Sequence, residues 1–507
     1  MKILYKYHLH LKRNYVILLS LGILGLAILA GSFFIDYGKL LLYLKAQDSS
    51  TIEYDGEKFN PEKVVVFKGA EVTFKNLSER EFWPASNIHP INGLYPEFNS
   101  DFSIVPDDSW SFVFERVGEW DYHDHLKSPV GGEIVVIDRN PLKRNDACSK
   151  ISNLSYGERQ VCWYFEMKEI IEKEGINKAF DHLTYLFSTE PTFAGGCHDV
   201  THLIGESSYR RFAEGEKLKF EGDTSYCGYG YYHGFIEAML FATGDYEQAK
   251  ELCESADDFL KSTIRNPNAT YACYHGMGHA MFDSHSPHLW GDEEKMIEPA
   301  LAICEQITEG LEEEKRKQCA TGIFNALGIA YSNDQYNLKM NESDPVWICR
   351  KQPELYKGAC FAEVSMSWII KAGERGSNFD FNKAAAFVNS IGDPIGERVS
   401  AMSLSSEYAR VHRSEFSEED LIEKCNLFSG ENNDNCVSGV VLTLMHWGLP
   451  GEEFKDAISF CKNSLMSDTQ KEACFGYLLP RLGTLYSSEK ADEICASIDE
   501  EYRYLCE

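Results

Sequence analysis

The pattern of hydrophobic and polar positions changes twice along the chain, and each change predicts a different kind of structure. Residues 14–35 carry no charge and are mostly apolar. At about 1.5 Å per residue, a helix of this length can cross a hydrocarbon core of about 30 Å. Residues 51–138 contain short runs of β-branched and aromatic residues separated by turn residues, which indicate strands. From residue 146 to residue 507, apolar residues recur at three-to-four spacing, which indicates helices.

The first of these segments predicts a transmembrane helix that acts as a signal anchor. Basic residues precede it, namely Lys2, Lys6, Lys12 and Arg13, whereas the chain becomes acidic after it. The positive-inside rule then makes residues 1–13 a cytoplasmic tail and residues 36–50 an outer linker. A cleaved signal peptide is the alternative, but the run is long and lacks a small-residue cleavage site. We therefore expect a single-pass plasma-membrane protein with most of the chain extracytoplasmic.

The second segment predicts an antiparallel β-sandwich. Its sequence resembles the cupredoxin family in four stretches that occur in the family's order. These are Phe59-Asn60-Pro61, Val72-Thr73-Phe74-Lys75-Asn76, Gly118-Glu119-Trp120-Asp121-Tyr122-His123-Asp124-His125 and Gly132-Glu133-Ile134-Val135-Val136. The resemblance covers the whole segment and implies an all-β, cupredoxin-like domain over residues 51–138.

The metal chemistry that this resemblance implies is altered in the present chain. A blue-copper site needs two histidines, a cysteine thiolate and usually a methionine. The family's cysteine is replaced by His123, and no methionine follows before the last strand, which excludes blue-copper electron transfer. The remaining candidate ligands are His89, His123 and His125, with Glu97 or Asp124 as oxygen donors. Such a nitrogen and oxygen set favours Cu(II). A metal-free cupredoxin fold that serves as a spacer or docking module is the alternative.

The cysteines of the third segment predict an all-α array of helical hairpins. All 16 cysteines follow residue 147, and a repeated pattern places the second cysteine of each pair at the start of a helix rich in small residues. From Cys273 to Cys474 the second cysteines are 46, 41, 76 and 38 residues apart, so one repeat lacks cysteines. A period near 40 is typical of a solenoid or toroid. An even cysteine count suits disulfides in an oxidising compartment, whereas zinc binding is disfavoured by the long, irregular separations. The expected disulfides are Cys148–Cys162, Cys197–Cys227, Cys253–Cys273, Cys304–Cys319, Cys349–Cys360, Cys425–Cys436, Cys461–Cys474 and Cys495–Cys506.

Histidines gather in three consecutive repeats of this array. Two of the repeats place histidines four residues apart, on one helical face, which is the spacing that chelates a transition metal. The candidate ligands are His198, His202, His233, His275 and His279, and the carboxylates about one turn later are Glu206, Glu237 and Asp283. Because neighbouring hairpins stack, we expect a pocket that binds a metal or uses a histidine as a general base. The alternative is that these histidines only pack between helices.

Composition and charge narrow the possible functions. The net charge of −30, from 79 acidic and 49 basic residues, excludes a nucleic-acid partner. We expect a membrane-anchored, extracytoplasmic metal-binding protein, with copper or another divalent transition metal as its ion. The alternatives are a scaffold that binds a protein partner on the helical array, or a metal-dependent enzyme that uses the histidine repeats. The chain has no Walker loop, Gly-x-Ser-x-Gly or His-Glu-x-x-His motif that would identify an enzyme class.

Overall fold

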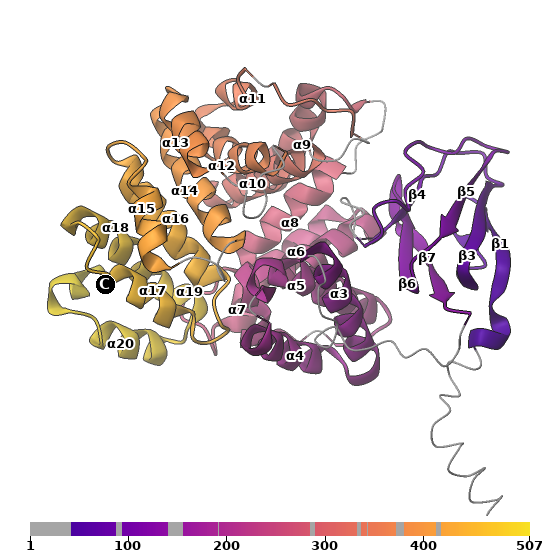
Figure 1. Ribbon diagram of the computed structural model, residues 1–507, viewed down its shortest axis with the longest axis horizontal. Coiled ribbons are helices and arrows are strands. Elements are labelled where there is room, and N and C mark those ends of the chain that lie inside the picture. Colours follow the sequence, from indigo (N-terminus) through magenta and orange to yellow (C-terminus); the bar gives the residue numbers. More distant parts are fainter. Residues whose placement is uncertain are drawn as a thin grey trace, which may run out of the picture. The chain divides into compact units, whose positions relative to one another are not determined.

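The computed structural model describes residues 42–87, 94–139, 156–190, 192–217, 219–283, 289–331, 336–341, 343–371, 380–411 and 417–506 (Figure 1). These residues form two compact units. The sheet unit comprises residues 42–81, 104–122 and 131–139. The helical unit comprises the helices from residue 156 onward together with residues 82–87, 94–103 and 123–130.

The β-strands form one mixed, seven-stranded sheet. Its strands are β1 (Gln47–Tyr54), β2 (Phe59–Asn60), β3 (Lys63–Asn76), β4 (Pro84–Ser86), β5 (Ser109–Phe114), β6 (Gly118–Asp124) and β7 (Lys127–Ile137). The order is β2-β1-β3-β7-β6-β4, and β5 pairs with β3. Strand β3 runs parallel to both β1 and β7, so the prediction of a purely antiparallel arrangement is wrong.

Strand β3 is also longer than the sequence indicates. The sequence indicates two strands separated by Lys68-Gly69, but the structure has one strand of 14 residues through that point. Its first half pairs with β7, from Lys63 opposite Glu133 onward, and its second half pairs with β5. Side chains at alternate positions of the strand, such as Val72 and Phe74, are fully buried, as expected for strand periodicity.

The helical unit consists of consecutive helical hairpins, which confirms the predicted repeats. The helices are α3 (Tyr156–Glu174), α4 (Ile176–Thr189), α5 (Cys197–Ala213), α6 (Tyr226–Thr243), α7 (Tyr246–Leu260), α8 (Ala269–Asp283), α9 (Glu293–Ile307), α10 (Glu313–Ala330), α11 (Trp347–Arg350), α12 (Glu354–Lys371), α13 (Phe381–Ser390), α14 (Pro394–Val411), α15 (Glu418–Cys425), α16 (Asn432–His446), α17 (Glu453–Cys461), α18 (Asp468–Leu478), α19 (Leu482–Leu485) and α20 (Ser488–Ala496). The hairpin α13–α14 is the expected repeat without cysteines.

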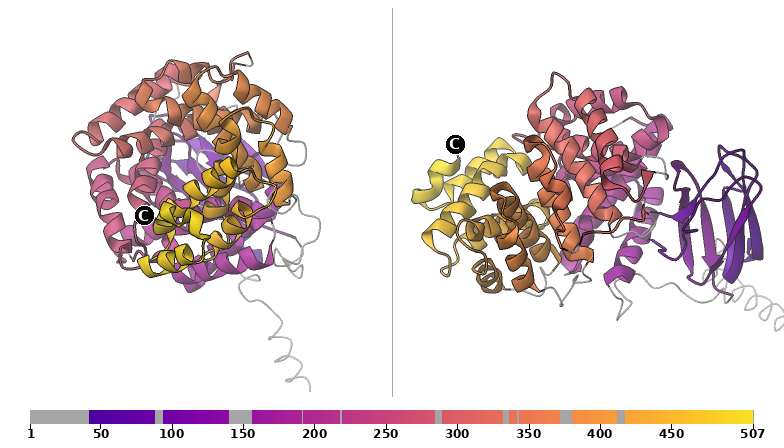
Figure 2. Two further views of the ribbon diagram at one scale, coloured as in Figure 1. Left: turned by 90° about the vertical axis from the view of Figure 1, so that its left-hand side faces the viewer. Right: turned by 90° about the horizontal axis from the view of Figure 1, so that it is seen from above.

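The repeats close into a ring, which selects the toroid over the open solenoid. The helices α5, α6, α8, α10, α12, α14, α16 and α18 each pack against the next, and Figure 2 shows them following one another around a ring. Backbone hydrogen bonds join the segment between α7 and α8 to the C-terminal part of the array. The amide of Arg265 donates to the carbonyl of Tyr486 at 2.8 Å, and that of Asn266 donates to Gly483 at 2.7 Å.

Disulfides join the two helices of most hairpins, as predicted. The described residues contain Cys197–Cys227, Cys253–Cys273, Cys304–Cys319, Cys349–Cys360, Cys425–Cys436, Cys461–Cys474 and Cys495–Cys506. Cys162 is also disulfide-bonded, and its expected partner Cys148 lies outside the described residues. Most of these cysteines are fully buried, so the crosslinks belong to the core of the ring.

Removing the Cys304–Cys319 disulfide by a double substitution to alanine is expected to destabilise the protein by about 3 kcal/mol. The bond closes a loop with a sequence separation of 15, and a loop of about that length restricts the unfolded chain by roughly this amount. Urea unfolding of the double variant and the wild type measures the difference. An unchanged unfolding midpoint would contradict the proposed stabilising role of this crosslink.

The membrane prediction requires a correction. No helix in the part of the chain that the structure describes is long and apolar enough to cross a membrane. The longest, α3, has 19 residues and carries charged side chains along its length. The expected single-pass topology and plasma-membrane location are therefore contradicted. Residues 14–35, on which that expectation was based, lie outside the described residues.

Candidate metal centre

Three neighbouring helices, α5, α6 and α8, bring together all five histidines of the histidine-rich repeats. Helix α6 packs against α5 on one side and against α8 on the other. Each helix contributes two residues that are four positions apart and therefore share a face. The pairs are His198 and His202 on α5, His233 and Glu237 on α6, and His275 and His279 on α8.

Glycines allow the three helices to approach closely enough for their histidines to meet. A β-carbon at Gly234 would lie 2.1 Å from the carbonyl oxygen of His202, and one at Gly205 would lie 2.0 Å from that of Tyr231. On the other side of α6, a β-carbon at Gly276 would lie 3.0 Å from the α-carbon of His233. Larger residues at Gly234 or Gly205 would force the backbones apart. The glycines that weaken these helices individually are therefore required for the contact between them.

His198, His202 and His233 direct one ring nitrogen each toward a common point. Nε2 of His198 lies 3.1 Å from Nδ1 of His233 and 3.1 Å from Nε2 of His202. Nε2 of His202 lies 3.2 Å from Nδ1 of His233. Three nitrogens at these mutual distances can bind one ion at the length of about 2.0–2.1 Å that zinc–imidazole bonds have. In the described residues, this group is the one set of three or more potential ligands compact enough to hold a metal ion.

A hydrogen bond behind His198 and a carboxylate behind His202 leave the converging nitrogens of these two rings with lone pairs available for a metal ion. Nδ1 of His198 lies 2.7 Å from the carbonyl oxygen of Cys227, which can only accept a hydrogen bond, so this nitrogen carries the proton. Nδ1 of His202 faces the carboxylate of Glu237 at 3.8 Å. A carboxylate or carbonyl behind a ligating histidine fixes its tautomer in this way at many metal sites. The arrangement therefore favours coordination over hydrogen bonding among the three rings.

Burial keeps the cluster uncharged. Desolvation lowers the pKa of His198, His202, His233 and His275 below the usual histidine value, and it lowers that of His279 to about 3. Mutual repulsion among the rings acts in the same direction for most of them. The histidines are therefore neutral at physiological pH, which is the form that binds metals.

The backbone at the start of α6 adopts an unusual conformation that serves this site. Cys227, Gly228 and Tyr229 have φ values of 53°, 67° and 61°, and all three are in the left-handed region. Residues other than glycine rarely adopt this conformation, and such strain typically costs about 1–3 kcal/mol per residue. The carbonyl group of Cys227 is the one that accepts the hydrogen bond from His198. The strained turn thus helps to orient a candidate ligand.

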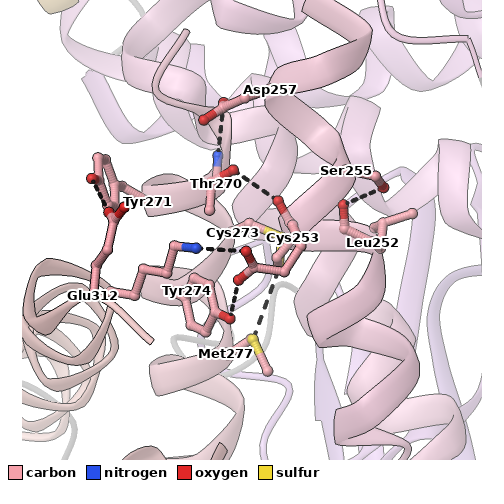
Figure 3. A network of polar contacts seen from close by, with 12 residues as sticks. Leu252, Cys253, Ser255, Asp257, Thr270, Tyr271, Cys273, Tyr274, Met277 and Glu312 are labelled. Carbon is pink, nitrogen blue, oxygen red and sulfur yellow. Dashed lines mark hydrogen bonds and ion pairs between the residues drawn. A yellow bond between two sulfur atoms is a disulfide. The ribbon is translucent and has the colours of Figure 1, made fainter. Parts of the chain in front are cut away.

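Figure 3 shows how the start of α8 is attached to α7 by polar contacts and a disulfide. The Thr270 amide donates to Oδ1 of Asp257 at 3.1 Å, and the Thr270 hydroxyl donates to the carbonyl of Cys253 at 2.8 Å. The Cys253–Cys273 disulfide lies beside these contacts, with Met277 against its sulfur. These interactions hold α8, the helix that carries His275 and His279, in position against α7.

The structure adds residues from distant repeats that the sequence did not indicate. The ring of Trp447 lies 6.5 Å from that of His198, and the guanidinium of Arg410 lies 6.0 Å from the Trp447 ring. Arg410 also donates to the carbonyl of Gly195, just before α5. His446 lies close to the start of α6, since a β-carbon on Gly228 would be 3.6 Å from Nδ1 of His446. Closure of the ring brings these residues to α5, and no local sequence pattern predicts that proximity.

The three carboxylates predicted beside the histidines have different positions. Glu237 lies between His202 and His279, with Oε1 3.2 Å from Nδ1 of His279. Glu206 instead pairs with Arg210 on the same helix at 2.5 Å. Asp283 is the last residue of α8, and its side chain lies outside the described residues. Glu237 is thus the predicted carboxylate that the structure brings to the histidine cluster.

The candidate copper ligands of the β-rich region are only partly brought together. Nε2 of His123 lies 3.2 Å from Nδ1 of His125, and both residues are buried. Asp124 accepts hydrogen bonds from the amides of Trp83 and Leu126, so its carboxylate organises the backbone. The other two candidates are Glu97, which is exposed, and His89, which lies outside the described residues. Binding of copper by this set remains a prediction.

Comparison with protein-family models and with characterised proteins finds no match to this chain. We therefore infer the function from the geometry of the site. What the structure establishes is a mixed sheet, a disulfide-linked ring of helical repeats and a cluster of three histidines that can hold a metal ion.

Proposed function

We propose that this protein is a metal-binding protein whose primary site consists of His198, His202 and His233. The observation that carries the proposal is the convergence of three buried ring nitrogens within 3.1–3.2 Å of one another. Packing alone does not explain this arrangement, because lone pairs that point at one another are unfavourable unless a proton or a metal ion lies between them.

We propose a divalent transition metal as the ion, with Cu(II) preferred. Imidazole nitrogens suit copper, zinc, iron and nickel, and among divalent ions of the first row the affinity of such ligands is highest for copper. Three protein nitrogens leave at least one coordination position for water or another ligand. The ion can therefore take a small ligand in addition to the three imidazoles.

We also propose that the β-sheet is a cupredoxin-like module. The order of its family-like stretches, from Phe59-Asn60-Pro61 to the segment around Gly132, supports this assignment, and a sheet of seven strands is compatible with it. Its histidines His123 and His125 adjoin each other, but the module is not needed for the site in the helical ring.

Equilibrium dialysis of the purified full-length chain against Cu(II) or Zn(II), followed by elemental analysis, tests the proposal. We expect bound metal that survives dialysis against a weak chelator, with Cu(II) retained more tightly than Zn(II). A chain that retains neither metal would overturn the proposal. Tighter retention of Zn(II) would overturn the choice of copper.

A further inference from the structure

We propose that a second divalent transition-metal ion binds beside the first, with His275 and His279 of α8 as its protein nitrogen ligands and Glu237 as the carboxylate between the two sites. This inference rests on the proposed function, because it adds a neighbouring site to the three-histidine centre. It makes the helical ring the holder of a two-metal centre.

The arrangement of the three helices is the first reason. Helix α6 lies between α5 and α8, and its two residues at i and i+4 face different neighbours. Nδ1 of His233 points toward the α5 pair, at 3.1 Å from His198 and 3.2 Å from His202. Glu237, one turn later, places Oε1 3.2 Å from Nδ1 of His279 on α8. The middle helix therefore supplies one polar group to each histidine pair.

The two histidine pairs have the same local geometry. His275 and His279 are four residues apart on α8, and their Nε2 atoms are 3.0 Å apart. His198 and His202 are four residues apart on α5, and their Nε2 atoms are 3.1 Å apart. Both pairs are thus preorganised to chelate one ion through Nε2. In the metal-free protein, a single proton between His275 and His279 can occupy the place of the ion.

Glu237 gives the second pair the tautomer that a metal requires. Oε1 of its carboxylate lies 3.2 Å from Nδ1 of His279, and this contact favours a proton on that nitrogen and a lone pair on Nε2. The same carboxylate approaches Nδ1 of His202 at 3.8 Å with its other oxygen. The Glu237 side chain is only 13% exposed. Its negative charge would offset part of the positive charge of the two ions.

Contact between the two groups of histidines places the proposed ions side by side. The rings of His233 and His275 are stacked, with centroids 4.7 Å apart and planes inclined by 19°. The ring centroids of His275 and His279 are 4.9 Å apart. Five neutral imidazoles and one carboxylate therefore form a continuous buried group, larger than a single ion needs.

The metal content of the full-length protein after saturation with Cu(II) and dialysis against a weak chelator tests this proposal. We expect two ions per chain in the wild type and one in a variant with His275→Ala and His279→Ala. A variant with His198→Ala and His202→Ala should lose the ion of the first site and keep the one at α8. A His182→Ala variant is the matched control, because that histidine lies on α4 beside Glu166, and it should retain two ions.

The outcomes separate this proposal from the one on which it rests. One ion per chain in both the wild type and the α8 double variant would overturn the second site but leave the first. Two ions in both proteins would place the second ion elsewhere and would also overturn it. No retained metal in the wild type would overturn both. Electron paramagnetic resonance of the loaded wild type needs no variant: two neighbouring Cu(II) ions should couple and broaden the signal, whereas an isolated-copper spectrum would contradict the proposal.

Discussion

Replacing His198 with alanine is expected to weaken metal binding at least about 100-fold. The substitution removes one of three converging nitrogens, together with the hydrogen bond that ties the ring to the Cys227 carbonyl. Loss of a residue that merely supports a ligand typically costs about 10–100-fold in affinity, so loss of the ligand itself should cost more. Competition with a chelator of known affinity measures the change.

The same substitution at His182 provides the control for this prediction. That histidine lies 3.6 Å from Glu166 and outside the cluster, so its removal should leave the affinity unchanged. Circular dichroism should show that both variants retain their helices. Equal affinities of the His198→Ala variant and the wild type would show that the metal does not bind at this cluster.

Acidification of the metal-free protein from pH 7.5 to 5.5 is expected to lower its stability by several kcal/mol. Burial lowers the pKa of His198, His202, His233, His275 and His279 below the usual 6.5, so the folded state keeps these rings neutral. The unfolded chain binds protons on them once the pH falls below about 6.5. Stability is therefore retained above that pH and is lost as the pH falls, by up to about 1.4 kcal/mol per unit for each ring that stays neutral.

Urea unfolding at a series of pH values measures this dependence. The variant with His275→Ala and His279→Ala lacks two of the five rings, so its stability should fall less steeply than that of the wild type. Identical slopes for the two proteins would show that the buried histidines do not cause the loss of stability. Bound metal should raise the stability at each pH without making this slope shallower, because the ion binds the neutral rings that the folded state already contains.

The repeats and their crosslinks could be predicted from the sequence because their signals are local. Cys253 and Cys273 are 20 residues apart, and the interval between repeats shows which cysteines belong together. The same regularity reveals the repeat without cysteines, since the interval between Cys360 and Cys436 is twice the usual one. The i and i+4 spacing of His275 and His279 likewise indicates a shared helical face, because that spacing needs no knowledge of distant contacts.

Features that depend on long-range closure could not be predicted. Trp447 and Arg410 come close to His198 only because the ring brings the repeats of α14 and α16 back to α5, and no local sequence pattern indicates this. The parallel partners of β3 were missed for a related reason. Residues 64–67 and 71–74 each look like a short strand, and only the register with β1 and β7 shows that they are one. The sequence also does not show that Glu206 forms an ion pair with Arg210, whereas Glu237 lies beside the histidines.

The most direct test of the central claim is a crystal structure of the Cu(II)-loaded protein with anomalous diffraction data collected at the copper absorption edge. We expect a strong anomalous peak at the point where the ring nitrogens of His198, His202 and His233 converge, with metal–nitrogen distances of about 2.0–2.1 Å. A fully loaded crystal without a peak at these three histidines, or with its strongest peak elsewhere, would contradict the account.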